Sequence, residues 1–152
     1  MQRPFSKELT VNYNQNKHKL FWAVDNNNID YIQEMIDDEE NDTSFLATKN
    51  ISGLSALHYA IKFCKVDTLY FLLAKAGNSL INLTDDDGNT LLHTAINTND
   101  LEKVQAIINY NPNLTIKNNE KLTPICLAKQ IKNLNQNIKF RLKEYIKNNK
   151  NI

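Results

Sequence analysis

Two similar stretches, one repeat apart, constrain this chain more than any other feature of its sequence. Residues 53–60 read GLSALHYA and residues 88–95 read GNTLLHTA, so a glycine, a leucine, a histidine and an alanine recur in register. The second stretch begins 35 positions after the first (88 − 53). A period of this size indicates one supersecondary unit repeated along the chain, and such a unit buries its apolar side only by stacking on its neighbours. The sequence therefore predicts an array of stacked units.

The repeat extends over four units when four alanines are superposed. Ala23, Ala60, Ala95 and Ala128 are separated by 37, 35 and 33 residues. Six positions after each alanine stands an aliphatic residue, and these are Ile29, Val66, Leu101 and Leu134. The pattern weakens in the fourth unit, where Asn137 and Arg141 take apolar positions. Inserting one residue there restores an apolar helical face made of Ile138, Leu142, Tyr145 and Ile146.

Each unit is predicted to hold two helices joined by a short turn. In the first unit a helical face begins near Lys17, asparagines 26–28 mark the turn, and a second helix runs from Ile29 to Ile36. Residues 1–16 show no sustained period and are expected to form a flexible N-terminal arm. The repeat domain is then 17–152, with units at approximately 17–49, 50–84, 85–117 and 118–152. The extra residues of the longer periods fall near 37–42 and 77–79, as surface loops.

These motifs resemble the ankyrin-repeat family over residues 17 to 152. The signature of that family is Thr-Pro-Leu-His-x-Ala on a period of about 33 residues, and residues 82–90 look like its hairpin finger leading into a first helix. The resemblance implies an all-α ankyrin-repeat solenoid of about four helix-turn-helix units with short hairpin fingers. The chain departs from the signature in that Ala56 and Leu91 replace the proline, which survives as Pro124, and Cys126 replaces the histidine of the fourth unit.

Several single residues carry structural expectations. Ser55 and Thr90 stand where a hydroxyl can cap the first helix of a unit. The resemblance implies that His58 and His93 hydrogen-bond between adjacent units. The glycine usual at the inter-helix turn is replaced by Asn27, Cys64, Asn99 and Lys132. Asparagine tolerates a left-handed backbone, whereas Cys64 is predicted to be strained there. Trp22 is expected to be buried against the N-terminal arm, and the alternative is that it is exposed as another anchor.

Composition excludes little but favours a cytoplasmic protein. The net charge of +1 gives no general attraction to nucleic acid or anionic lipid. Two cysteines are too few for a disulfide framework and suit a reducing compartment. Residues 1–16 lack the apolar core of a signal peptide, and the sequence holds no apolar run of 18 residues, so no membrane span is expected.

A search for chemical motifs favours binding over catalysis. His58 and His93, with Cys64 and Cys126, lack the close spacing of zinc ligands, so no metal site is expected. Residues 85–89 resemble a calcium loop only superficially, because Leu83 occupies the first ligand position, and a solvated finger tip is the preferred interpretation. Phosphate-binding and nucleophile-elbow motifs are missing. We therefore expect no enzyme activity, no catalytic residue and no cofactor.

The resemblance places a partner protein on the concave face, which fingers and first helices form in this family. The positions carried over are Asp25, Asn26, Ile51, Ser52, Leu54, Lys62, Phe63, Asp86, Asp87, Asn89, Asn97, Thr98, Asn119 and Glu120, with Leu122 and Gln130 in the same set. Ile51, Leu54 and Phe63 are the candidate anchors, because apolar side chains expected to face water often mark interfaces. Phe63 has an equal alternative, which is to fold back onto a neighbouring helix.

The functional hypothesis is a monomeric, non-catalytic module that holds one protein partner. With its Asn and Lys bias the chain is similar to small free-standing ankyrin-repeat proteins of intracellular bacteria, some of which are delivered into a host cell, so an effector or adaptor in the host cytosol is one version. The alternative hypothesis rests on the uneven distribution of charge along the chain. Residues 25–42 hold eight acidic and no basic residues, whereas residues 117–152 hold nine basic residues against Glu120 and Glu144. That basic end could bind nucleic acid or an anionic membrane, although a soluble capping helix is the preferred interpretation.

Overall fold

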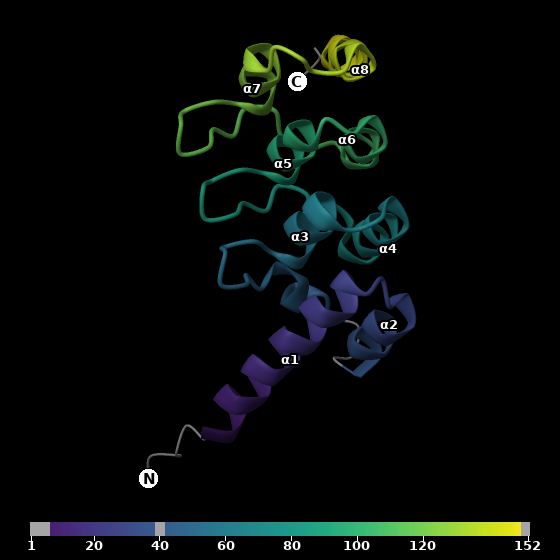
Figure 1. The fold of residues 1–152 in the computed structure, drawn as a ribbon, viewed down its shortest axis with the longest axis vertical. Coiled ribbons are helices and arrows are strands. Elements are labelled where there is room, and N and C mark those ends of the chain that lie inside the picture. Colours follow the sequence, from purple (N-terminus) through teal and green to yellow (C-terminus); the bar gives the residue numbers. More distant parts are fainter. Residues whose placement is uncertain (1–6, 39–41, 150–152) are drawn as a thin grey trace.

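The computed structural model describes residues 7–38 and 42–149, and it places them in a stack of helix pairs (Figure 1). The pairs follow the chain order, with the N-terminal pair at one end and the C-terminal pair at the other. The helices are α1 Lys7–Asp25, α2 Ile29–Asp38, α3 Ala56–Phe63, α4 Val66–Ala76, α5 Leu91–Thr98, α6 Leu101–Ile108, α7 Pro124–Gln130 and α8 Gln136–Asn148, with short 3₁₀ turns at Ser44–Ala47 (η1) and Gly77–Ser79 (η2). The predicted all-α solenoid is confirmed.

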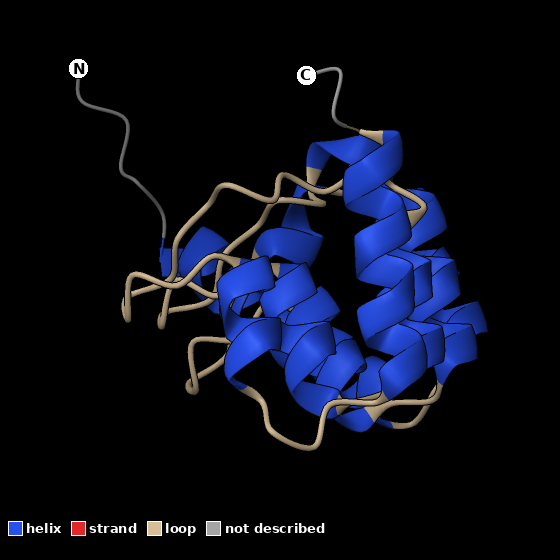
Figure 2. Ribbon diagram, turned by 90° about the horizontal axis from the view of Figure 1, so that it is seen from above, coloured by secondary structure: helices blue, strands red, loops and turns tan. Residues whose placement is uncertain are grey.

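Two rows of helices give the stack its layers (Figure 2). One row holds the first helix of each pair, in which α3 packs on both α1 and α5, and α5 packs on α7. The other row holds the second helices, in which α6 packs on both α4 and α8. Loops project from the side of the first row, and these are the fingers (Figures 1 and 2). In the described fingers the pairing is limited to isolated bridges, Lys49 with Ser55 and Thr84 with Thr90.

The core lies between the rows and between successive pairs. The alanines that define the register, from Ala23 to Ala128, are all buried, because each first helix approaches its neighbours closely there. Leu57, Leu92 and Ile96 are fully buried in the same layer. Burying one such side chain stabilises a fold by about 1.5–3 kcal/mol, and most of this burial is against another unit. The apolar periodicity of the sequence is therefore the cause of the stacking.

Helix ends follow the side chains that the sequence places there. Ser55, Thr90 and Thr123 each accept the backbone N–H three residues later, as N-caps of α3, α5 and α7. Asn27 and Asn99 adopt left-handed conformations with φ of 51° and 56°, as the missing glycines predict. Cys64 does not, because its φ of −101° and ψ of 168° are those of extended backbone. The prediction of strain at Cys64 is wrong.

The first helix is longer than the sequence predicts. Helix α1 begins at Lys7, ten residues before the expected start near Lys17, so residue 16 does not mark a change of secondary structure. A helix that is already nucleated extends by one hydrogen bond per residue, without needing an apolar period. The remainder of the predicted arm, residues 1–6, lies outside the described residues, as does part of the predicted loop, residues 39–41.

Trp22 also differs from expectation, because its side chain is 56% exposed. Its ring meets Tyr31 of α2 edge-on, with the ring centroids 6.1 Å apart. Trp22 occupies the position of Tyr59 in the next unit, and Tyr59 packs on the ring of Phe21 from the preceding unit. Trp22 thus lies on the outer side of the N-terminal unit, where sequence periodicity alone does not tell a stacked position from an end position.

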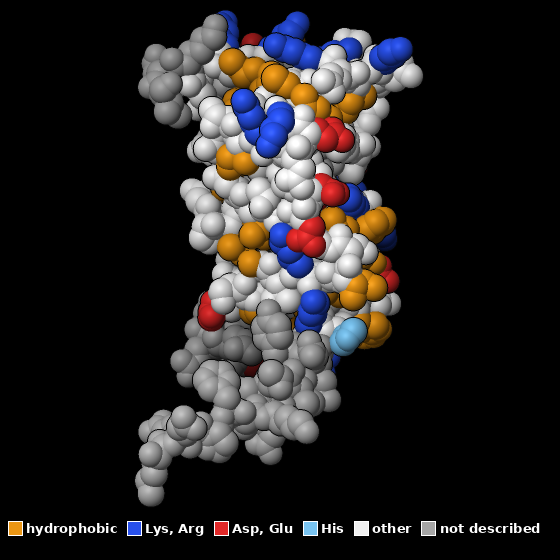
Figure 3. All heavy atoms as spheres, turned by 90° about the vertical axis from the view of Figure 1, so that its left-hand side faces the viewer, with side chains coloured by type: hydrophobic (Ala, Val, Ile, Leu, Met, Phe, Trp, Pro, Cys, Tyr) orange, Lys and Arg blue, Asp and Glu red, His pale blue; other side chains and the backbone are white. Residues whose placement is uncertain are grey.

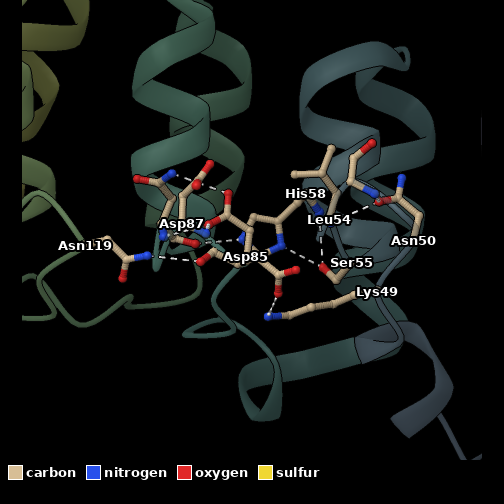
Figure 4. Close-up of polar contacts among 11 residues, drawn as sticks. Lys49, Asn50, Leu54, Ser55, His58, Asp85, Asp87 and Asn119 are labelled. Carbon is tan, nitrogen blue, oxygen red and sulfur yellow. Dashed lines mark hydrogen bonds and ion pairs between the residues drawn. The ribbon is translucent and has the colours of Figure 1, made fainter.

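Two histidines connect neighbouring units through backbone carbonyls, as the resemblance implies. His58 Nε2 lies 2.9 Å from the carbonyl oxygen of Asn89, and His93 Nε2 lies 2.9 Å from that of Leu122. A carbonyl oxygen only accepts, so each Nε2 carries the proton and each Nδ1 is an acceptor. Nδ1 of His58 lies 2.7 Å from the hydroxyl of Ser55, and Nδ1 of His93 accepts the backbone N–H of Thr90 (Figure 4 shows His58 and Ser55). Each neutral ring therefore donates one hydrogen bond through Nε2 and accepts one through Nδ1.

Burial keeps these rings neutral. Loss of hydration lowers the pKa of His58 from 6.5 to about 4, and the bond to the Asn89 carbonyl opposes this only in part. The pKa of His93 is lowered for the same first reason. Protonation of His93 at Nδ1 would turn an acceptor into a second donor and break the hydrogen bond from the backbone N–H of Thr90.

Replacing Leu92 with alanine is expected to lower the free energy of unfolding by about 2–5 kcal/mol. Leu92 is fully buried in α5, between the units on either side, and its removal leaves a cavity. Asp38→Ala is the control, because Asp38 is exposed at the end of α2. Denaturant unfolding followed by circular dichroism measures both variants. Equal losses of stability would contradict the stacking register.

Stability is also expected to fall as the pH is lowered from 6.5 toward 4. An unfolded histidine binds a proton near pH 6.5, whereas folded His58 does so only near pH 4, so the unfolded state binds more protons in this window. His58 alone contributes about 3 kcal/mol to the loss. Urea unfolding at pH 7, 6 and 5 measures it. The dependence of the unfolding free energy on pH should be weaker in His58→Gln and unchanged in His18→Gln, since His18 is exposed. A stability that does not change between pH 7 and 5 would refute the neutral, buried assignment.

Candidate partner-binding surface

The fingers are rigid because each one folds around a buried or half-buried Asx side chain. Asp85 Oδ1 accepts the backbone N–H groups of Asp87 and Asn89, at 3.0 and 2.8 Å. Asn50 accepts in the same way from Ser52 and Leu54, and Asn118 from Leu122 (Figure 4 labels Asn50 and Asp85). Asp85 is only 4% exposed, so the solvated finger tip predicted for residues 85–89 is wrong at its first residue. Asx turns hold these loops in one shape.

Neighbouring fingers are also joined to each other. The backbone N–H of Asp86 donates to the carbonyl of Gly53 at 3.2 Å, and that of Asn119 donates to the carbonyl of Asp87 at 2.9 Å. The amide of Asn119 donates to the carbonyl of Asp86 at 3.0 Å. Lys49 forms an ion pair with Asp86 at 2.8 Å (Figure 4). The three fingers therefore present their tips at a fixed spacing, which a partner can use without ordering them first.

Gly53 and Gly88 allow this close approach. Their φ values are 72° and 73°, a left-handed conformation that glycine adopts without strain. A Cβ added to Gly53 would overlap the side chain of Asp86, and one added to Gly88 would lie 2.8 Å from Asn119 Oδ1. Both glycines thus serve the contact between one finger and the next.

Most of the predicted finger residues are exposed. Ile51 is completely exposed at 101%, and Ser52, Asp86, Asp87, Asn119 and Glu120 are exposed as well. Leu54 is only 6% exposed, so its role as a water-facing anchor is wrong. The reason is its place just before the Ser55 cap, where the chain turns in toward α3. Asn89 and Leu122 are partly buried, because their carbonyls accept the bonds from the histidines.

The first helices add an aromatic ladder beside the fingers. Phe63 is 63% exposed, and its ring centroid lies 4.8 Å from that of Tyr59 on the same helix. Tyr59 meets Phe21 edge-on at 5.6 Å and donates its hydroxyl proton to Asp25 at 2.7 Å. That bond to a carboxylate raises the pKa of the Tyr59 phenol. Phe63 packs on a residue of its own helix and faces solvent, so it does not fold back onto a neighbouring helix, and its role as an anchor stays a prediction.

Sequence reasoning missed Phe21 and Tyr59. A usable signal was present, because Tyr59 and Phe63 are four residues apart and such pairs meet on a helix. Phe21 offered no comparable signal, since only the stacking of α1 on α3 brings it to Tyr59. Of the other predicted first-helix residues, Asp25, Asn26, Lys62, Asn97 and Gln130 are exposed and Thr98 is half-buried.

We define the finger–helix surface as the exposed members of both groups, on the side of the molecule seen in Figure 3. Its fingers contribute Ile51, Ser52, Asp86, Asp87, Asn119 and Glu120, and its first helices contribute the exposed Asp25, Asn26, Lys62, Phe63, Asn97 and Gln130, together with the half-buried Tyr59. The figure shows apolar, acidic and basic side chains interspersed on this side, with Lys and Arg gathered at the upper end over the C-terminal unit. A mixed surface of this kind suits a protein partner better than a uniform polyanion.

The two cysteines lie in different surroundings. The thiol of Cys64 donates to the carbonyl of Val24 at 3.1 Å and so joins the first two units. Burial raises its pKa to about 11, which disfavours the thiolate that a nucleophile requires. Cys126 is exposed, and both cysteines are free. Within residues 7–38 and 42–149, His, Cys, Asp and Glu side chains form no group of three or more that could hold a metal ion.

Helix length sets a further limit on the described part of the chain. Here the helices are too short or too polar to cross a bilayer.

Comparisons with known proteins match this geometry. Residues 20–73 and residues 72–128 each match a family model described as ankyrin repeats (many copies), so the two matches together span most of the chain. Over 89 residues the chain is 35% identical to alpha-latroinsectotoxin-Lt1a of Latrodectus tredecimguttatus. That match covers 59% of this chain but only 6% of the toxin. Ankyrin repeats indicate a protein–protein interaction module, and the chain belongs to the ankyrin-repeat family.

Proposed function

We propose that the chain is a non-catalytic module that holds one partner protein on the finger–helix surface. The observation that carries the proposal is the aromatic ladder next to the rigid finger tips, in which the exposed Phe63 packs on the half-buried Tyr59, and Tyr59 packs on the half-buried Phe21. Exposed aromatic side chains that are already packed lose little conformational entropy on binding, and such residues often dominate interface energetics. The fingers add polar groups at fixed spacing around this apolar centre.

The charges on this surface define the chemistry of the partner. Asp87 is exposed on the central finger, and Asp25 lies at the edge of the aromatic ladder. Asp86 is already paired with Lys49, which leaves Asp87 as the acidic group of that tip without an ion pair among the described residues. A partner that offers an apolar side chain to Phe63 and a Lys or Arg to Asp87 would match both features.

A cytoplasmic setting, either native or that of a host cell, is part of the proposal. The sequence holds only two cysteines, and both are free, which fits a reducing compartment. An effector or adaptor delivered into a host cell is one form of this hypothesis, and it rests on the Asn and Lys bias of the sequence. Capturing partners separately from a host lysate and from a lysate of the source organism, followed by mass spectrometry, distinguishes the two settings.

Phe63→Glu is expected to weaken the affinity for the captured partner by about tenfold or more, because it places a charge in the apolar centre of the interface. Calorimetry with the identified partner measures the affinity. Phe140→Glu is the matched control, since Phe140 is 60% exposed but lies on α8 in the other row of helices. Unchanged affinity in Phe63→Glu, or an equal loss in both variants, would reject this surface.

A second candidate function concerns the basic end of the stack. Phe140 is exposed on α8 among the exposed cations Arg141, Lys143 and Lys147. An aromatic side chain surrounded by cations suits an anionic membrane surface, into which the ring inserts while the cations meet headgroups.

Vesicles containing phosphatidylserine test this second candidate. We expect salt-sensitive sedimentation of the protein with these vesicles and a clear loss in the Lys143→Glu, Lys147→Glu double variant. Lys62→Glu is the control, because Lys62 is an exposed lysine on α3. If wild-type protein stays in the supernatant at low salt, membrane binding is excluded.

A further inference from the structure

The repeat register identifies which positions of a unit face the preceding unit. Thr68 and Lys103 are equivalent, being 35 residues apart, and both bond backward. Thr68 Oγ1 donates to Asn27 Oδ1 at 2.8 Å, and Lys103 Nζ donates to the carbonyl of Ile61 at 2.7 Å. Four positions later, Leu72 and Ile107 are fully buried. This strip of the second helix is therefore a stacking surface.

In the first unit the same strip is apolar but partly open. Its equivalents are Tyr31 and Met35, 37 residues before Thr68 and Leu72, and both are only half-buried. Trp22 lies beside them at 56% exposure, in contact with Tyr31. A cleft of ≈ 280 Å³ opens next to the strip, between α1, α2 and residues 42–48, with Leu20 and Met35 in its lining. We call Trp22, Tyr31, Met35 and this cleft the N-terminal end face (Figure 1 shows α1 and α2 at that end).

The opposite end of the stack is built differently. Val24, Ile61 and Ile96 are fully buried at one position of the repeat, and the fourth unit places Lys129 there, exposed. Cys126, also exposed, replaces the histidine that would bond to a following unit. The C-terminal end is thus polar where stacking would require apolar groups, as terminal repeats in water usually are. At the N-terminal end the stacking strip keeps apolar residues, Tyr31 and Met35.

Charges on the N-terminal end face are arranged in two opposed groups. Lys17 and Lys19 lie on α1 at one side of the cleft, and Glu34 and Asp38 lie on α2 at the other, while Asp42 also lines the cleft. Within the described residues the one ion pair joins Lys49 to Asp86, so these four groups form none with each other. A two-fold axis that lies in the plane of this face and runs along the groove between α1 and α2 would set α1 of one copy against α2 of the other. Each lysine pair would then meet the acidic pair of the partner.

We propose that the N-terminal end face binds a second copy of this chain in an isologous dimer. A two-fold interface requires one surface to be complementary to itself. This face supplies a projecting Trp22, a cleft and two groups of opposite charge, each of which finds its complement in the other copy. The dimer replaces the monomer that the sequence alone suggests, and it leaves both finger–helix surfaces free for partners.

Analytical ultracentrifugation of the full chain over a series of concentrations tests the proposal. Wild type should approach twice the mass of one chain and go no further, because a two-fold contact closes. Trp22→Glu should remain a monomer at the same concentrations with an unchanged circular dichroism spectrum. Tyr70→Glu is the matched control, since Tyr70 is an exposed aromatic residue on α4 and lies outside the face, so this variant should still dimerise.

Charge exchange tests the pairing itself. The Lys17→Glu, Lys19→Glu variant and the Glu34→Lys, Asp38→Lys variant should each be monomeric, and mixing them should give a 1:1 dimer. The Lys129→Glu, Lys143→Glu variant, altered at the C-terminal end, should dimerise as the wild type does. A monomeric wild type at all concentrations, open-ended growth beyond a dimer, or loss of association in the C-terminal variant would overturn the proposal.

Discussion

The fold depends on one constraint, which is that a single helix pair has too much apolar surface to be stable in water by itself. Each pair buries that surface against the next, and the buried alanines let the first helices come close. The histidines then add a polar link in the same direction, from His58 to Asn89 and from His93 to Leu122. Because these bonds end on finger carbonyls, packing of the helices and placement of the fingers are one event.

This coupling explains how much of the structure could be predicted from sequence. Helix pairs, caps and histidine bonds follow from local residue types and from the period, since the same contacts recur at every step. The long α1, the exposure of Trp22 and the burial of Leu54 could not be predicted in this way. Each of them depends on where a unit lies in the stack or how its finger turns in, and the period alone does not give either.

The finger–helix surface likewise combines features that the sequence predicts with features that only the tertiary structure shows. Ile51, Phe63 and Asp87 were predicted from positions that the repeat leaves exposed. The ladder from Phe63 to Phe21 requires the tertiary contact between α1 and α3, and the rigidity of the fingers requires bonds from one loop to another, such as Asp86 to Gly53. Stacking thus produces a pre-organised surface from segments that are far apart in the chain. The two ends of the stack differ for a related reason, because only the last unit exchanges a buried aliphatic residue for Lys129.

Native-state hydrogen exchange of backbone amides tests the central claim most directly. If successive helix pairs are stable only together, the slowest amides of α3 and α5 should open with the same free energy, equal to that of global unfolding. Their response to denaturant should also be the same, although the two helices belong to different units. A markedly lower opening free energy for one of the two would show that the pairs are stable independently, and it would contradict the account.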